Sequence, residues 1–371
     1  MGRHLVLIGG GHAHMVTLAN IHHVVSLGHR VTVIGPSSYH YYSGMGPGML
    51  GGTYRPEDIR FATRRVVESR GGRFVKGKAA AIDPEKRKVI LDTGESVSYD
   101  VLSVNAGSFV PEDIVTAPGD ADVYRTKPIE GLLTARERLI ERSSREDVQV
   151  AIVGGGPSAA EIAGNIWQLL KESGERMPAI TVFAGSGLMA TFPDGVRRRI
   201  RRSLVHRGIQ IIDGDHVTDI DDGTVSTRSG GSHRADVIFL ALGVKPSSIF
   251  SQSGLPTGPD GGLRVNRFLQ STRHPEIFGG GDCIHFEDQP LDKVGVYAVR
   301  ENPILYHNLL AALDGSTLKA FDPGGDYLLI FNLGGGKGVL RKQWLTFGGK
   351  TAFLIKDAID RRFMKKFQAI E

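Results

Sequence analysis

The sequence has little cysteine and no long hydrophobic run, and both shortages exclude classes of protein. Its one cysteine, Cys283, rules out a disulfide framework and a dithiol relay within one chain. The longest apolar run, Val237 to Val244, is far too short to cross a membrane. The four-residue apolar run after His4 is also too short for a signal peptide. We therefore expect a cytoplasmic protein without structural disulfides.

Basic residues are in slight excess, but their pattern does not indicate nucleic-acid binding. The net charge of +5 at pH 7 suits an anionic cofactor, an acidic membrane surface or simple solubility. The densest basic run, Arg197 to Arg202, shares a helical period with Val196, Ile200 and Leu204. This period indicates a solvated helix face or, as an alternative, a contact to a 2′-phosphate. Since no aromatic residues are interleaved with these bases, we expect no nucleic-acid partner.

Glycine, by contrast, is abundant, and it marks two similar segments. A run of three consecutive glycines lies in each of HLVLIGGGHAHMVTLA (residues 4–19) and QVAIVGGGPSAAEIAGNI (residues 149–166), and the chain has 49 glycines in all. Each loop leads into a helical pattern and then a second apolar segment, Arg30–Gly35 or Ala179–Gly185. Two strand–turn–helix–strand units, about 145 residues apart, predict two dinucleotide-binding loops.

The first loop carries a histidine where the third glycine of G-x-G-x-x-G belongs. Gly9 and Gly11 permit a tight turn and a close approach of backbone N–H groups to a pyrophosphate, and the helix N-terminus adds about half a positive charge. We expect the His14 side chain to point away from the strand or to sit over the phosphates. A metal site built from His12 and His14 would need further ligands, and the next histidines along the helix point the wrong way. No metal is therefore expected.

Several further segments resemble one family of flavoproteins. RADVIFLALGVKPSS (234–248) and RHPEIFGGGDC (273–283) are similar to the pyridine-nucleotide-dependent flavoproteins, which include disulfide reductases, type II NADH dehydrogenases and sulfide:quinone oxidoreductases. Four further segments resemble the flavoprotein module that is found fused to selenide, water dikinase. They are YYSGMGPGMLGGTY (41–54), YRTKPIEGL (124–132), AVRENPILYHNL (298–309) and KDAIDRRFMKKF (356–367). The resemblance implies an α/β fold with two Rossmann-like dinucleotide-binding domains (the FAD/NAD(P)-binding fold) and a small C-terminal α+β unit.

The order of these segments predicts how the chain divides. The FAD-binding domain is expected to be discontinuous, over residues 1–115 and 246–320, with the NAD(P)H-binding domain over 116–245 between its parts. The last unit, 321–371, is expected to hold two strands, Tyr327–Leu333 and Val339–Phe347, followed by an amphipathic helix.

The resemblance also implies FAD as the cofactor and NADH or NADPH as a cosubstrate. Asp282 matches the acid that holds the ribityl chain of FAD. The other residues expected around FAD are Gly9, Gly11, His12, Ala13, His14, Gly35, Pro36, Ser43, Gly44, Met45, Pro47, Ala79, Asn105, Ala106, Gly107, Gly281, Gly295 and Val296. Those expected around NAD(P)H are Gly154, Gly156, Pro157, Ser158, Ala159, Ala184 and Gly243. Relatives commonly have an acid at the position of Ala184, so we expect weak discrimination between NADH and NADPH.

Four residues are candidates for catalysis. Glu161 matches an acid near the nicotinamide in relatives, although a charge at a helix N-terminus explains it equally well. In relatives, the helix that here begins near Gly295, Val296 and Tyr297 puts backbone N–H groups at the pyrimidine edge of the flavin, and Tyr297 is the candidate at this position. Arg300 and Glu301 stand near the positions where type II dehydrogenases carry glutamines facing the quinone. They either handle protons for the acceptor or pair on the surface.

The position of Lys127 is a separate question. Lys127 lies either near the flavin or in a linker between domains.

The expected reaction transfers a hydride from NAD(P)H to FAD and then electrons to a quinone-like acceptor. Thiol chemistry is not expected, because the second loop carries Ser158 and Cys283 has no partner thiol. The alternatives are a reductase for a selenium or sulfur compound and a redox-sensing flavoprotein with slow turnover. The sequence does not indicate an oligomeric state.

The last helix has an apolar face that permits two interpretations. Its face is formed by Ile355, Ile359, Phe363, Phe367 and Ile370, is broadened by Leu354, Ala358 and Met364, and is bordered by Lys356, Arg361, Arg362, Lys365 and Lys366. Either this face packs on the protein's own core, or it lies among lipid headgroups on the inner face of the cell membrane.

Overall fold

Two parallel sheets form the centres of two units, and the computed structural model describes residues 2–117 and 119–371 of the chain. The sheet of the N-terminal unit has the strand order β22-β9-β1-β2-β5. Its strands are β1 (His4–Ile8), β2 (Arg30–Gly35), β5 (Arg73–Lys76), β9 (Val101–Val104) and β22 (Ile277–Gly279). β1 and β9 are buried almost from end to end, as strands covered on both faces are. The first predicted strand–turn–helix–strand unit is confirmed.

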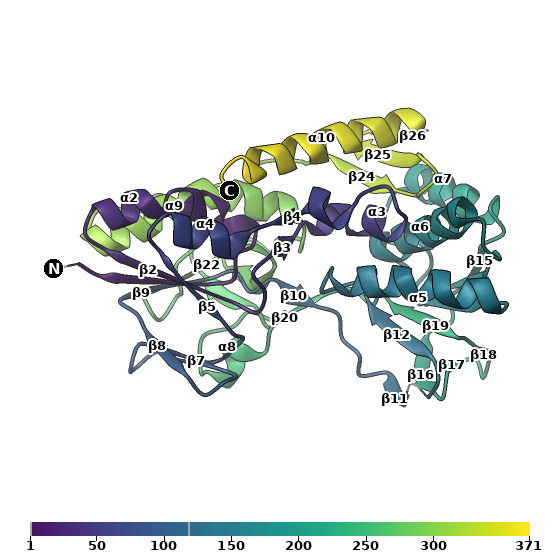
Figure 1. Ribbon diagram of the computed structural model, residues 1–371, viewed down its shortest axis with the longest axis horizontal. Helices are drawn as coiled ribbons and strands as arrows, with labels where there is room; N and C mark the ends of the chain where they lie inside the picture. The colour runs from purple at the N-terminus through teal and green to yellow at the C-terminus, as the bar shows by residue number, and fades with distance from the viewer. Residues whose placement is uncertain (1, 118) are drawn as a thin grey trace.

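The central unit repeats this plan in the order β12-β19-β13-β14-β15. Its strands are β12 (Asp122–Arg125), β13 (Gln149–Val153), β14 (Ala179–Ala184), β15 (Gln210–Asp213) and β19 (Val237–Leu240), and its helices are α5 (Gly131–Arg145), α6 (Pro157–Ser173) and α7 (Asp194–Val205). In α7, Val196, Ile200 and Leu204 are fully buried while the arginines stay at least partly exposed, as the helical period predicted. The two units lie side by side (Figure 1).

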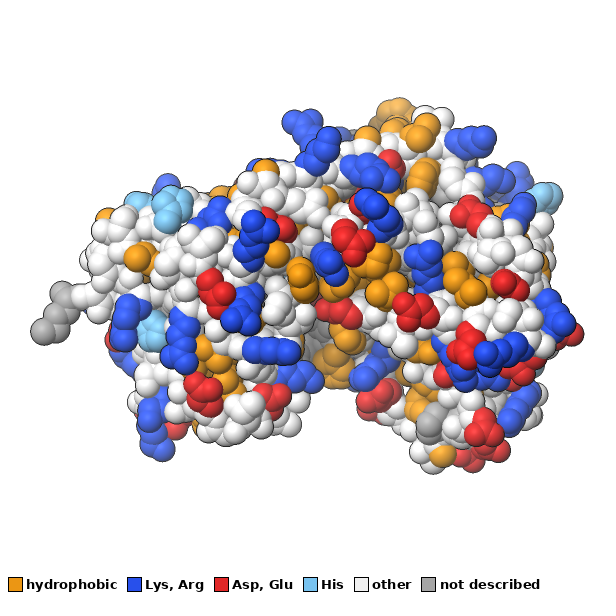
Figure 2. Space-filling view, in the orientation of Figure 1, with side chains coloured by type: hydrophobic (Ala, Val, Ile, Leu, Met, Phe, Trp, Pro, Cys, Tyr) orange, Lys and Arg blue, Asp and Glu red, His pale blue; other side chains and the backbone are white. Residues whose placement is uncertain are grey.

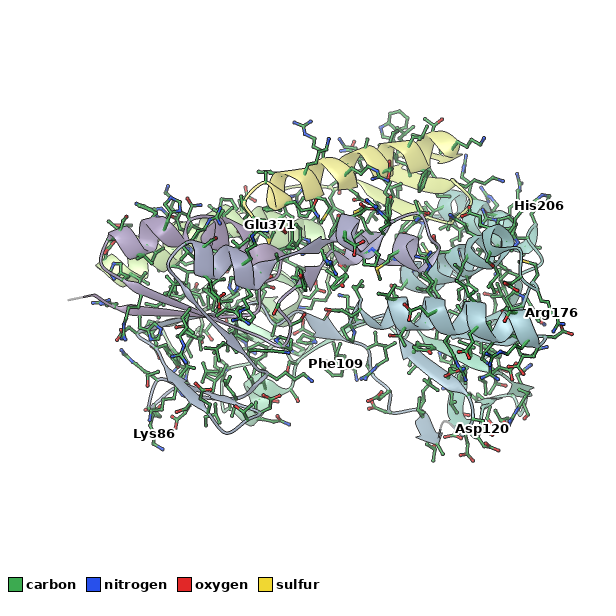
Figure 3. The ribbon with its side chains drawn as sticks, viewed as in Figure 1. Lys86, Phe109, Asp120, Arg176, His206 and Glu371 are labelled. Carbon is green, nitrogen blue, oxygen red and sulfur yellow. The ribbon has the colours of Figure 1, made fainter. Side chains whose placement is uncertain are left out.

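The chain crosses between the units along an antiparallel pair, β10 (Ser108–Phe109) with β20 (Lys245–Pro246). Phe109 marks this junction in Figure 3. Smaller sheets contain β6 (Ala79–Asp83), β7 (Lys88–Leu91) and β8 (Ser96–Ser98) in the N-terminal unit and β11 (Val115–Ala117), β16 (Val217–Asp221), β17 (Thr224–Thr227) and β18 (Ser232–Arg234) in the central unit. Two short pairs join β3 (His40–Tyr41) to β4 (Arg60–Phe61) and β21 (Leu263–Val265) to β23 (Ile284–Phe286).

The N-terminal unit has several short helices and one long one, α9 (Gly295–Asp314). The short helices are η1 (His12–His14), α1 (Met15–Ala19), α2 (Ile21–Ser26), η2 (Ser43–Met45), α3 (Gly46–Leu50), η3 (Pro56–Ile59), α4 (Thr63–Ser69), α8 (Ile249–Gln252) and η4 (Gly281–Cys283). α9 packs on η1 and α1, whereas α3 packs on α5 and α6 and so joins the two units.

The C-terminal unit differs from its prediction in one respect. β24 (Leu329–Asn332), β25 (Gly338–Lys342) and β26 (Leu345–Gly349) form one antiparallel sheet. The predicted strand 339–347 is therefore a hairpin, which turns at Gln343, where φ is +52°. α10 (Lys350–Gln368) then runs from the central unit to the N-terminal unit (Figure 1). In the described part of the chain, no helix is long and apolar enough to cross a membrane.

Candidate flavin and nucleotide sites

The first glycine loop lies against the end of β9, and this contact requires glycine. A Cβ atom on Gly9 would lie 2.2 Å from the Asn105 carbonyl oxygen, and one on Gly11 would lie 2.8 Å from Asn105 Nδ2. Gly9 also has a φ of +87°, which favours glycine. Asn105 Nδ2 is buried and has no hydrogen-bond partner among the described residues. An unpaired donor beside a glycine loop fits a polar ligand such as a pyrophosphate.

His14 lies beneath this loop, and the prediction for its side chain was wrong. Its Nδ1 is 2.7 Å from the Gly9 carbonyl oxygen and its Nε2 is 2.8 Å from Ser103 Oγ on β9. A carbonyl only accepts, so Nδ1 donates to Gly9 and Nε2 accepts from the Ser103 hydroxyl. Burial lowers the pKa of His14 to about 4, so the ring is neutral. The imidazole thus ties the loop to the strand below it.

His12, two residues earlier, contacts the C-terminal helix instead. Its ring stacks on Phe363 of α10, with centroids 5.3 Å apart and planes 19° apart, and its centroid lies 5.1 Å from that of Tyr42. Burial lowers the pKa of His12 to about 3. The two histidines of the loop therefore have different partners, one in β9 and one in α10.

Asp282 lies in η4, at the carboxyl end of β22, and it joins both units. Its Oδ2 accepts a hydrogen bond from Lys127 Nζ at 2.8 Å and one from Ser108 Oγ at 2.7 Å. Lys127 therefore lies at this site. It is not in a linker between domains, because it stands between β12 and α5 of the central unit. Sequence reasoning missed Ser108, which no motif marked.

Gly295 and Val296, which were expected around FAD, form the amino end of α9. Two of the catalytic candidates, Tyr297 and Arg300, follow them in this helix. The ring of Tyr297 lies 5.5 Å from that of Tyr327. Arg300 donates to the carbonyl oxygens of Pro323 and Gly325. Both side chains thus hold the segment that leads to β24.

Glu301 has a different environment from its neighbour. Its side chain is buried, and its carboxylate accepts the Gly281 backbone N–H, directly before Asp282. Burial raises the pKa of Glu301 to about 7. The alternative in which Arg300 and Glu301 pair on the surface is wrong, since α9 turns one toward a loop and buries the other.

The second glycine loop repeats the close contact of Gly9 but not that of Gly11. A Cβ on Gly154 would lie 2.1 Å from the Ala241 carbonyl oxygen, whereas Gly156 and Gly243 have nothing within 4 Å. The open space lies at the N-terminus of α6, which begins with Pro157. Ala159 is fully buried, so this alanine permits the close helix–strand packing that a third glycine would.

β14 ends in Ala184, and the neighbouring strand β15 places an acidic residue, Asp213, beside it. Ala184 is fully buried and pairs in register with Asp213 on β15. Asp213 Oδ1 accepts the Leu188 backbone N–H at 2.7 Å, and Oδ2 pairs with Arg201. Sequence reasoning missed Asp213, because strand pairing alone brings it beside Ala184.

A buried polar cluster lies where α10 covers the N-terminal unit. Lys356 Nζ donates to the Gly44 carbonyl at 2.8 Å and to Asp360 Oδ2 at 2.6 Å, and the Tyr42 hydroxyl donates to Asp360 Oδ1 at 3.1 Å. Lys356 was expected to border the apolar face of this helix, but it is itself buried, with 8% of its surface exposed. The face of α10 that carries Lys356 and Asp360 is therefore part of the protein core.

Glu161, on α6, adds a second buried acid on this side. Its Oε1 accepts the Asn332 backbone N–H at 2.7 Å. Burial raises the pKa of Glu161 to about 7, although the nearby Lys356 charge acts in the opposite direction. The carboxyl group is therefore poised to gain or lose a proton near neutral pH.

The remaining residues expected around FAD lie at the ends of strands of the N-terminal unit or in the short elements that follow these strands. They are Gly35 and Pro36 at the end of β2, Ala79 at the start of β6, Ala106 and Gly107 after β9, Ala13 in η1, Ser43 and Met45 in η2, and Pro47 in α3. Figure 2 shows the molecular surface hollowed between the N-terminal and central units.

The fold and the paired loops define a flavoprotein that binds two dinucleotides. Residues 3–308 match the pyridine nucleotide-disulphide oxidoreductase family, and the chain belongs to that family. It is 24% identical to the type II NADH:quinone oxidoreductase of Staphylococcus saprophyticus, over 99% of this chain and 96% of that protein. It is 27% identical to the demethylphylloquinone reductase NdbB of Synechocystis, over 76% and 72% of the two chains. The solved NDH2 of Plasmodium falciparum, in complex with NADH, matches with a TM-score of 0.80 at 15% identity, over 100% of this chain and 97% of that chain.

This protein is an FAD-dependent NAD(P)H oxidoreductase. The loop contacts and the unpaired Asn105 Nδ2 suit a pyrophosphate, so Gly9, Gly11 and Asn105 would hold that part of FAD, and Asp282 would hold its ribityl chain. When bound, FAD accepts a hydride from the reduced nicotinamide and passes electrons to a second substrate. The second loop, with Gly154 and Gly156, would hold NAD(P)H.

Proposed function

We propose that the protein is an NAD(P)H:quinone oxidoreductase. The observation that carries the proposal is the absence of an available thiol in the described part of the flavin site. Cys283 is fully buried, its Sγ lies 3.4 Å from the Val104 carbonyl oxygen, and burial raises its pKa to about 12. A buried, protonated thiol is a poor nucleophile, so the acceptor has to take electrons from the flavin directly.

The surroundings of Gly44 support a planar acceptor with few hydrogen-bonding groups. The rings of His12, Tyr42 and Phe363 gather here, beside the Lys356–Asp360 pair. Reduction of a quinone to a quinol consumes two protons as well as two electrons. Glu161, with a pKa near 7, is suited to supply one of them at neutral pH.

We also propose that the C-terminal unit attaches the enzyme to a membrane surface, though not through the whole face expected from the sequence. Met364 and Phe367 are buried, and Phe363 stacks on His12. The exposed large apolar residues of this unit are Trp344 (88%), Leu354 (62%), Ile359 (47%) and Leu345 (43%). Hydrophobic and basic side chains are interspersed along α10 and the hairpin before it (Figure 2). Such a mixture suits anionic headgroups.

Steady-state oxidation of NADH and NADPH with a water-soluble quinone tests the enzymatic proposal. We expect turnover with quinones and none with sulfur or selenium compounds, and Glu161→Gln is expected to slow the quinone reaction at neutral pH. Turnover confined to a sulfur or selenium acceptor would refute the quinone proposal. Slow turnover with every acceptor, together with tight NAD(P)H binding, would instead favour a redox sensor.

A further inference from the structure

Lys127 comes from the central unit, but its side chain ends in the N-terminal unit. It follows β12 at the carboxyl edge of the central sheet. Its Nζ lies 2.8 Å from Asp282 Oδ2 and 2.9 Å from Ser108 Oγ, and Ser108 Oγ is 2.7 Å from the same carboxylate oxygen. All these hydrogen bonds to the carboxylate use Oδ2. Among the described residues, none donates to Oδ1, which is left for a ligand hydroxyl.

Other charges near Asp282 do not replace this ion pair. Lys293 faces it from the loop before α9, but Lys293 Nζ lies 2.7 Å from Asp260 Oδ2. Glu301 faces it from α9 and carries the same sign of charge as Asp282 when ionised. Lys127 is thus the cation that pairs with Asp282 directly.

The imidazoles of His12 and His40, on which the Lys127 charge acts, are neutral and do not compete with Lys127. Burial lowers the pKa of His12 to about 3 and that of His40 to about 4, and the Lys127 charge acts in the same direction on both. Burial alone would raise the pKa of Asp282, but the Lys127 charge and hydrogen bond outweigh it, and the pKa is below its usual range. The site therefore keeps an ionised carboxylate in a largely buried place.

We propose that Lys127 is a positioning residue for FAD with two consequences. It holds the Asp282 carboxylate ionised and oriented, with one oxygen occupied and the other available to the ribityl hydroxyls. Its positive charge also favours reduced FAD, which binds with more negative charge than oxidised FAD. Because Lys127 is anchored in the central unit, the nicotinamide-binding half of the protein contributes directly to the flavin cradle.

The test compares Lys127→Met with Ser108→Ala, which removes a hydrogen bond to the same oxygen without removing a charge. Purified protein stripped of FAD is titrated with FAD between pH 5 and pH 8, with flavin fluorescence as the readout. We expect Lys127→Met to weaken FAD binding about tenfold or more at pH 7, since a hydrogen bond between charged groups is lost. The loss should grow as the pH falls, because Asp282 without its partner takes up a proton in this range. Ser108→Ala should weaken binding less, and equally at every pH.

The midpoint potential of the bound flavin provides the second readout. In Lys127→Met, reduced FAD should bind about tenfold more weakly relative to oxidised FAD, a fall of about 30 mV. Lys127→Arg should restore both the affinity and the potential. Lys127→Gln serves the same comparison if the methionine variant does not fold.

FAD binding that stays independent of pH in Lys127→Met, with an unchanged potential, would overturn the proposal. A Ser108→Ala variant that matched Lys127→Met in both readouts would do the same, because the effect would then owe nothing to charge. No electron acceptor is needed in either measurement, so the outcome is independent of the proposed quinone activity.

Discussion

Replacing His14 with alanine is expected to destabilise the N-terminal unit, because the ring links the FAD loop to the sheet beneath it. The substitution leaves the partly buried Gly9 carbonyl and the buried Ser103 hydroxyl without their partner. Each unsatisfied group costs about 1–3 kcal/mol. Water entering the vacated space would recover part of this loss, so we expect a net destabilisation of about 3 kcal/mol.

Urea unfolding, followed by circular dichroism with and without FAD, measures this loss. Part of it should appear as weaker FAD binding, since the Gly9 peptide is no longer held in place. Ser103→Ala is the matched control: it keeps the bond from His14 Nδ1 to Gly9 and should cost about 1 kcal/mol. A His14→Ala variant whose unfolding free energy and FAD affinity both equal those of the wild type would refute the role assigned to the ring.

The same ring predicts a dependence of stability on pH. The folded-state pKa of His14 is about 4, below the ordinary value of 6.5, so the unfolded chain binds the proton more readily between these values. The stability contributed by the neutral ring is therefore present above pH 6.5 and is lost as the pH falls toward 4. The His14→Ala variant should lose less stability across this window than the wild type.

Four further outcomes are expected. Asp282→Ala should release FAD, and a dialysed variant that remained yellow would contradict the ribityl assignment. Because residue 184 is an alanine and carries no charge, the values of kcat/KM for NADH and NADPH should differ less than about a hundredfold. A larger ratio would mean that another group, such as Asp213, recognises the ribose. Quinone reduction should slow above about pH 7, where Glu161 loses its proton, and Glu161→Gln should abolish this pH dependence. Combined Trp344→Ala and Leu354→Ala substitutions should weaken binding to anionic liposomes and leave FAD binding intact, whereas deletion from Lys350 onward should impair both, because α10 also covers the flavin loop.

Local sequence patterns were sufficient to predict the two glycine loops and the strands beside them. A glycine at Gly9 or Gly154 is required by contacts with the adjacent strand, and the apolar runs before the loops form strands buried on both faces. Such features depend on neighbours along the chain and on a sheet arrangement common to this family. The cofactor class therefore followed from the sequence.

The tertiary structure alone decided which charged residues meet at the site. Lys127 and Asp282 are 155 positions apart, and Lys356 and Gly44 are 312 apart. Periodicity showed that α10 is amphipathic, yet it could not show that Lys356 and Asp360 turn inward while Leu354 and Ile359 stay exposed. Glu371, at the end of the chain (Figure 3), accepts the Ala62 backbone N–H of the N-terminal unit. Which face of a helix is buried depends on what a distant part of the chain places against it, and a one-dimensional pattern carries no record of that contact.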